Sequence, residues 1–179
     1  MTKYAGCEQG RGWQERYGIH QKTKSLVKVM VWMGVYGQQL SKPVIFEDGT
    51  MDAQRYIDKV LPIALKCGNN KMWGNNWAYQ QDDARSHTHH LSQKWCADHF
   101  LAFISKDRWP PNLSDLCPFN YGLWDELGGA RNWKRISTKA TLIEEIKCAV
   151  EKIEKENIKN SVLDFTVRLC LIKTNGAVK

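Results

Sequence analysis

The run Leu26-Val27-Lys28-Val29-Met30-Val31-Trp32-Met33-Gly34-Val35 decides the fold of this chain. Four of its ten residues are valine, and β-branched residues favour strands over helices. A nearly continuous apolar run of this length is typical of a strand that is buried rather than half-exposed. We therefore expect a buried strand over residues 26–36.

The residues that follow this run predict a hairpin and then a helix. Residues 37–42 read as a turn, and residues 43–47 carry the apolar triplet of a second strand. Asp52 has the side chain of a helix N-cap, and apolar residues at helical spacing continue from it over residues 52–66. Pro62 has no backbone N–H and should kink this helix.

Further short elements alternate along the rest of the chain. We expect strands at 77–81 and 101–105, a helix at about 88–99, a helix at about 119–127, a helix that Ser137 or Thr138 caps, and a last helix with Val162, Phe165, Leu169 and Ile172 on one face. This order predicts the α/β class: one mixed sheet flanked by helices, with a C-terminal helical extension.

Composition and charge limit the possible functions. The chain has 179 residues, 42% of them hydrophobic and 25% charged, which fits one folded domain rather than a disordered chain. Its net charge is +7, so a nucleic acid is a plausible class of partner, although a basic surface without a special role remains an alternative.

The cysteines and the N-terminal residues indicate an intracellular protein. None of the six cysteines has Cys-x-x-Cys spacing, which argues against a zinc knuckle or a thioredoxin-type motif. We interpret each as a small, buried, reduced residue. Met1 is followed by polar residues instead of a signal-peptide core, and no stretch approaches about 18 apolar residues.

Asp82 is the candidate site residue, because it stands at the C-terminal end of the expected strand 77–81. Binding sites in open α/β sheets lie at this end of the strands, and a carboxylate there can hold Mg²⁺. The residues alone leave an alternative open, in which Asp82 or Asp83 only caps the next helix.

The surrounding motif resembles that of a known family. Gln80-Gln81-Asp82-x-Ala84-x-x-His87-Thr88 is similar to the motif around the second catalytic aspartate of mariner-type transposases. The stretch 109–124, with Trp109-Pro110-Pro111-Asn112 and Asp115-Leu116-x-Pro118, resembles the loop around that family's third acid. Similar matches occur in order at 29–35, 45–57 and 141–147, so the resemblance covers the chain from about residue 10.

The resemblance implies a ribonuclease-H-like catalytic domain over residues 1–133, with a truncated first strand, and a helical extension of the same domain over 134–179. In this family three carboxylates hold two Mg²⁺ or Mn²⁺ ions for DNA strand cleavage and transfer. Asp82 matches the second acid. Residue 120 matches the third, because 120 − 82 = 38 is the offset of the subgroup with Asp as third acid.

Two departures from the family pattern predict an inactive site. Position 120 is Asn120, whose amide has no charge to offset a cation; Asn120 also suits an ordinary helix N-cap. The first acid would fall at about Met1 or before it, and neither Glu8 nor Glu15 stands in the family motif. We therefore expect Asp82 to be the remaining metal ligand, with Mg²⁺ weakly bound or absent.

The sequence thus predicts a fragment of a mariner-type transposase catalytic domain that is inactive as written. The alternatives are a catalytically dead nucleic-acid-binding domain and a decayed transposon product without a selected role. The resemblance further implies non-specific contacts to DNA phosphates, a possible homodimer and a nuclear location. The family's helix-turn-helix region has no match here, and whether Met1 is the true start stays open.

Overall fold

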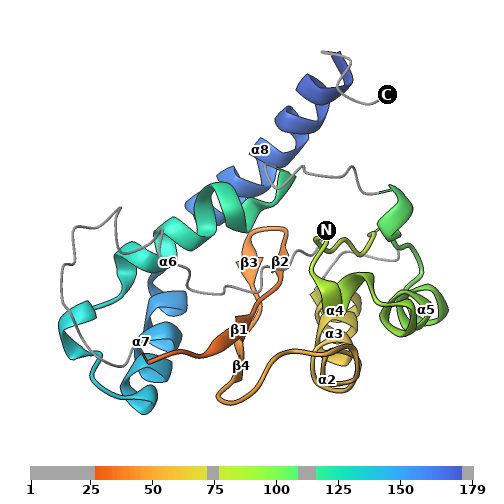
Figure 1. Cartoon of the computed structure of the whole chain (residues 1–179). Helices are drawn as coiled ribbons and strands as arrows, with labels where there is room; N and C mark the ends of the chain where they lie inside the picture. The colour runs from red at the N-terminus through yellow and green to blue at the C-terminus, as the bar shows by residue number, and fades with distance from the viewer. Residues whose placement is uncertain (1–26, 72–76, 109–115, 175–179) are drawn as a thin grey trace.

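The computed structural model describes residues 27–71, 77–108 and 116–174. The short strands lie in the middle of the molecule (Figure 1). Helices α2 (Ala53–Lys59), α3 (Leu61–Lys71), α4 (Arg85–Thr88) and α5 (His90–His99) lie on one side of them, and α6 (Trp124–Ala130) and α7 (Lys139–Lys152) lie on the other. Helix α8 (Lys155–Thr174) runs away from the strands toward the C-terminus. The described residues therefore form the layered α/β arrangement that the sequence predicts.

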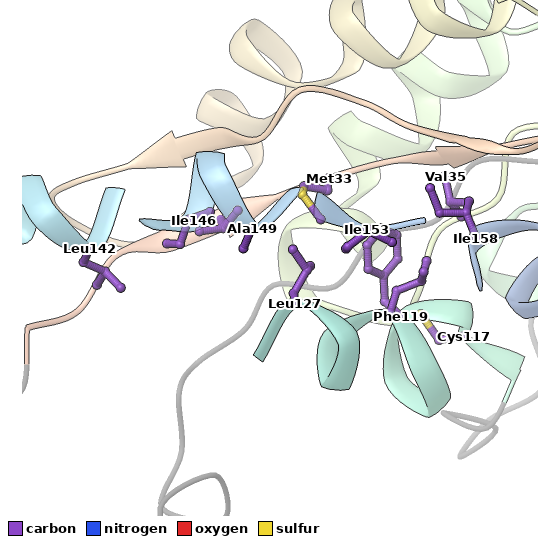
Figure 2. Packing of buried hydrophobic residues seen from close by; sticks show 12 residues of the cluster. Met33, Val35, Cys117, Phe119, Leu127, Leu142, Ile146, Ala149, Ile153 and Ile158 are labelled. Carbon is purple, nitrogen blue, oxygen red and sulfur yellow. The ribbon is translucent and has the colours of Figure 1, made fainter. Parts of the chain in front are cut away.

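Side chains of the first strand run alternate between two apolar clusters. Val31, Met33 and Val35 lie in the first cluster, together with residues of α6, α7 and α8 (Figure 2). Met30 and Trp32 point to the second cluster, which residues of α2, α3 and α5 complete. Because successive strand residues face opposite sides, an apolar run with no polar interruption is what a strand covered on both faces requires.

The predicted hairpin is present, but each arm is split into two short strands. Strand β1 (Met30–Trp32) pairs antiparallel with β4 (Val44–Phe46), and β2 (Val35–Tyr36) pairs antiparallel with β3 (Gln39–Leu40). Gly37, with φ +56°, lies in the tight turn between β2 and β3. The expected turn at 37–42 is therefore shorter than predicted.

The split has a physical cause across the hairpin. In the β1–β4 register Trp32 faces Val44, so the next pair would place Met33 opposite Pro43, which has no N–H to donate. The ladder stops there. Gly34 N instead donates to Ser41 Oγ at 2.8 Å, and Ser41 N donates to Gly34 O at 2.8 Å.

The strands expected at 77–81 and 101–105 are reduced to one parallel bridge between Tyr79 and Phe103. Tyr79 N donates to Ala102 O at 2.8 Å, and Ile104 N donates to Tyr79 O at 2.9 Å. Antiparallel and parallel pairing are thus both present. The expectation of one continuous sheet is wrong for the described residues, where the ladders do not join. The truncated first strand that the resemblance implies lies outside the described residues.

The first helices begin close to the predicted positions, but the helix expected at 52–66 continues to Lys71 and a helical turn at Arg85–Thr88 was not predicted. Asp52 is the N-cap of α2 (Ala53–Lys59), and its Oδ1 accepts from Arg55 N at 2.8 Å. The helix is interrupted at Val60 and continues as α3 (Leu61–Lys71), which confirms the effect of Pro62. The helix expected at 88–99 is α5 (His90–His99), and a single turn, α4 (Arg85–Thr88), precedes it.

The C-terminal third of the described chain is helical. It comprises η1 (Lys106–Arg108), the π-helical turn η3 (Phe119–Leu123), α6 (Trp124–Ala130), η4 (Trp133–Arg135), α7 (Lys139–Lys152) and α8 (Lys155–Thr174). Thr138 caps α7 and forms a capping box with Thr141, as its position predicts. Leu142, Ile146 and Ala149 of α7 pack into the same cluster as the strand residues (Figure 2).

Two expectations about single residues need correction. Cys96 and Cys117 are buried, but Cys148 and Cys170 are exposed, so not every cysteine is a small core residue. Leu169, expected on the buried face of the last helix, is 40% exposed because α8 extends beyond the layer it covers. None of the helices that the structure describes is long and apolar enough to cross a membrane.

Candidate active site

Asp82 lies between the parallel bridge at Tyr79 and helix α4, and its side chain is 18% exposed. Its Oδ1 accepts a hydrogen bond from Ala84 N at 3.1 Å and lies 2.6 Å from His87 Nδ1. The N-cap residue of α4 is Ala84, which provides no side-chain bond. Asp82 therefore stabilises the turn before α4 through the backbone N of Ala84, and it is not the N-cap of this helix. Asp83 is exposed.

His87 holds the Asp82 carboxylate from inside the protein. Its side chain is fully buried, and its ring packs on the ring of Tyr56 with centroids 4.4 Å apart. An ionised carboxylate can only accept hydrogen bonds, so Nδ1 carries the hydrogen and donates it to Asp82. The short distance of 2.6 Å is typical of a charge-assisted bond.

A buried polar network supports His87. Tyr56 Oη donates to Gln81 Oε1 at 2.7 Å, so Tyr79 Oη, 2.8 Å away, donates to Tyr56 Oη. Gln81 Nε2 donates to the backbone oxygen of His87 at 3.0 Å, and Gln93 Nε2 donates to the same oxygen at 2.8 Å. Both the ring and the carbonyl of His87 are thereby fixed by side chains from α2, α5 and the bridge strand.

The network continues to a basic surface. Gln93 Oε1 accepts from Lys106 N at 3.0 Å, which attaches η1 to α5. Lys106 and Arg108 of η1 are exposed, and so is Arg85 at the start of α4, three residues after Asp82. Arg85 therefore lies on the helix that follows Asp82, and η1 is joined to the His87 network through Gln93. These cations, with the exposed Asp83 and Asp107 among them, could contact a phosphate chain.

Asn120 lies in a different setting. It is exposed on the π-helical turn η3, and its backbone N donates to Cys117 O at 2.8 Å. The flanking Phe119 and Leu123 are fully buried in the first cluster (Figure 2). The helix starts before Asn120, with Pro118 in the N-cap position, so the interpretation of Asn120 as an N-cap is wrong. Because the resemblance assigns Asp82 and Asn120 to one metal site, we expect their side chains to lie close together, and this stays a prediction.

The described residues fit a single divalent ion better than a pair. Within 27–71, 77–108 and 116–174, no three His, Cys, Asp or Glu side chains gather around one point. Both hydrogen bonds that Asp82 makes there use Oδ1, which leaves Oδ2 for a cation. Mg²⁺ is commonly held by one or two carboxylates and several waters, so Asp82 could hold one ion loosely. Met1, Glu8, Glu15 and the stretch 109–115 lie outside the described residues.

Sequence reasoning missed the residues that support Asp82. Tyr56 was assigned to the apolar face of a helix, which is correct for its ring but hides the role of its hydroxyl. Gln93 carries no motif signal. Gln81 and His87 do stand in the quoted motif, and the structure brings both of them to Asp82, one directly and one through the His87 carbonyl.

Comparison with known proteins identifies the fold. No family model matches the chain, and no curated protein matches its sequence. Among solved structures, the Mos1 transposase catalytic domain with raltegravir and Mn aligns with a TM-score of 0.70 at 14% identity, over 93% of this chain and 78% of that chain. The catalytic domain of Mos1 mariner transposase alone aligns with a TM-score of 0.63 at 15% identity, over 78% of this chain and 69% of that one.

A larger assembly gives the same result. The chain in a pre-cleavage Mos1 transpososome aligns with a TM-score of 0.66 at 13% identity, over 84% of this chain and 46% of that chain. The present chain thus spans about half the length of that transposase chain. Likeness at this level of identity concerns the fold: the chain has the ribonuclease-H-like α/β fold of the mariner transposase catalytic domain.

Proposed function

We propose that this chain is derived from a mariner-type transposase catalytic domain and binds duplex DNA without cutting it. The observation that carries the proposal is the Asp82–His87 pair at the end of the bridge strand, inside the sequence motif of the family's second acid and in a domain with the family's fold. The proposal covers this stretch of chain and assigns it no complete transposition reaction.

The loss of cleavage follows from charge. Two-metal nucleases offset two divalent cations with several carboxylates and the substrate phosphate. Asn120 at the third position is neutral, so one of the carboxylates that would offset the cations is missing. A site with Asp82 and a neutral Asn120 would hold Mg²⁺ or Mn²⁺ weakly. In the family, divalent ions bound at this site activate the attacking oxygen and stabilise the leaving one.

DNA binding rests on the basic charge around Asp82. The net charge is +7, Arg85 is exposed on the helix that follows Asp82, and Lys106 and Arg108 are exposed on η1, which Gln93 joins to the His87 network. Contacts of this kind go to phosphates and carry no sequence information. We expect a dissociation constant on the order of 10⁻⁴–10⁻⁶ M that rises steeply with salt. The proposal also implies a nuclear location and permits a homodimer.

A binding experiment tests the DNA contact. Fluorescence anisotropy with a labelled duplex would compare the native chain with a variant carrying Arg85→Ser, Lys106→Ser and Arg108→Ser. A matched control would carry Lys134→Ser, Lys147→Ser and Lys152→Ser, which removes the same charge from the other side of the strands. We expect weaker binding and a smaller salt slope only in the first variant. Equal loss in both would contradict a DNA surface at Asp82.

A plasmid-nicking assay with Mg²⁺ or Mn²⁺ tests the missing activity. The native chain should leave supercoiled plasmid intact, because the neutral amide of Asn120 does not offset a second cation. Nicking by the native chain that disappears in Asp82→Ala would show that the protein is an active nuclease. A chain that does not fold would instead support the decayed-product alternative.

A further inference from the structure

We propose that His87 is a positioning residue that orients the Asp82 carboxylate so that Oδ2 is presented to one divalent cation. This inference rests on the proposed function, since it assigns the metal to Asp82. It adds a role for a residue that would hold no metal itself: His87 Nδ1 lies 2.6 Å from Asp82 Oδ1, and its ring is fully buried.

The geometry at Asp82 fixes the plane of the carboxylate. Oδ1 is held by two donors from different directions, the His87 ring and the backbone N of Ala84. Rotation about the Cβ–Cγ bond would break both bonds. Oδ2 is therefore held in one direction, and a ligand held in place loses less entropy when an ion binds than a rotating one does.

His87 is itself fixed at three places, which a merely space-filling residue does not require. Tyr56 packs on its ring face, Asp82 accepts from its ring edge, and the amides of Gln81 and Gln93 both donate to its carbonyl. Burying this many polar groups is unfavourable unless each is hydrogen-bonded. The network is buried at Tyr56, Tyr79 and Gln81, and its partly exposed end is the carboxylate of Asp82.

Two substitutions separate positioning from packing. His87→Phe keeps a ring against Tyr56 but removes the donor to Asp82. His87→Asn loses the ring but places an amide N–H near the position of Nδ1. A packing role predicts that Phe is the milder change, whereas a positioning role predicts that Asn preserves metal binding better than Phe does.

The experiment measures Mn²⁺ binding to the full chain by electron paramagnetic resonance, with circular dichroism to check folding. We expect weak binding by the native chain, loss of binding in Asp82→Asn, and affinity about 10–100-fold lower in His87→Phe, as for other residues that orient metal ligands. His87→Asn should recover most of that loss. Native-like affinity in His87→Phe, with binding still dependent on Asp82, would overturn the role of His87 and leave the proposed function intact.

A second measurement needs no variant at His87, in case His87→Phe does not fold. In the native chain with ¹⁵N-labelled histidine, the hydrogen-bonded Nδ1–H resonance of His87 should shift as Mg²⁺ is added, and the shift should be absent in Asp82→Asn. A resonance that stays in place at saturating Mg²⁺ would contradict the proposal. No Asp82-dependent binding of either ion by the native chain would overturn the metal site itself.

Discussion

The two faces of the central strand run are built from different chemistry, although the motif resemblance predicts an acid position above each, at residues 120 and 82. The cluster beneath Asn120 is apolar, with Phe119, Leu123 and Leu127 packed against the strand (Figure 2). The cluster beneath Asp82 contains the hydrogen-bonded network of Tyr56, Gln81 and His87.

This difference explains why one acid position could change more easily than the other. Asn120 is exposed on η3, where Phe119 and Leu123 of the same turn are buried in the first cluster. Asp82 is the acceptor for a fully buried histidine, so its loss leaves a buried donor without its partner. The fold itself therefore favours a carboxylate at position 82.

We expect the largest effect on stability from a substitution in the apolar first cluster, beneath Asn120. Phe119→Ala removes a fully buried ring from the first cluster and should lower the free energy of unfolding by about 3–5 kcal/mol. Chemical denaturation monitored by circular dichroism would measure it. Leu101→Ala is the control, because Leu101 is 70% exposed and its truncation should stay within about 0.5 kcal/mol. A similar loss in both variants would mean that Phe119 does not pack as described.

We expect an intermediate effect on stability from a substitution in the hydrogen-bonded network beneath Asp82. Tyr56→Phe keeps the ring against His87 but removes the hydroxyl that joins Tyr79 to Gln81, which leaves Gln81 Oε1 buried without this donor. The free energy of unfolding should fall by about 1–3 kcal/mol. Tyr36→Phe is matched to it: the hydroxyl of Tyr36 makes a longer, part-buried bond of 3.3 Å to Leu40 O, so its removal should matter less. The reverse order would contradict the network.

The sequence predicted local features well because they depend on neighbouring residues. The N-caps at Asp52 and Thr138 and the break at Pro62 each follow from a side chain or ring acting within one helical turn. The split of the hairpin arms was missed, because it depends on Pro43 lying opposite Met33 across the two strands. The short parallel bridge between Tyr79 and Phe103 likewise joins residues that local patterns cannot relate.

The site, too, could be predicted only where its residues are close together in the sequence. The motif identified Asp82 and included His87, which the structure places 2.6 Å from it. Tyr56 and Gln93 come from other helices and could be assigned to the site only from the three-dimensional arrangement. Asn120 was interpreted as an N-cap because asparagine favours that position, but the helix starts before it, at Pro118.

The smallest expected effect tests the link between the two faces. Lys139 at the start of α7 donates to Glu47 O at 2.8 Å and to Asp48 Oδ1 at 2.6 Å, and so connects a helix of the first cluster to the loop that leads into α2. Both side chains are exposed, 38% for Lys139 and 89% for Asp48, so water and salt screen the pair. Lys139→Ala should therefore lower stability only slightly.

The pH dependence of that small effect has a definite sign. The hydrogen bond and the charge of Lys139 lower the pKa of Asp48 below its ordinary value of 3.8. A carboxyl whose pKa is lowered by folding stabilises the protein above its ordinary pKa and loses that contribution as pH falls through the lowered value. Urea midpoints of the native chain and Lys139→Ala should thus differ at pH 7, converge in acid, and approach each other in high salt.

Lys159→Ala removes an exposed pair within α8 and should leave the link between the faces unchanged. A Lys139→Ala difference that persists in acid would assign the effect to the bond with the Glu47 carbonyl, which does not titrate, rather than to Asp48.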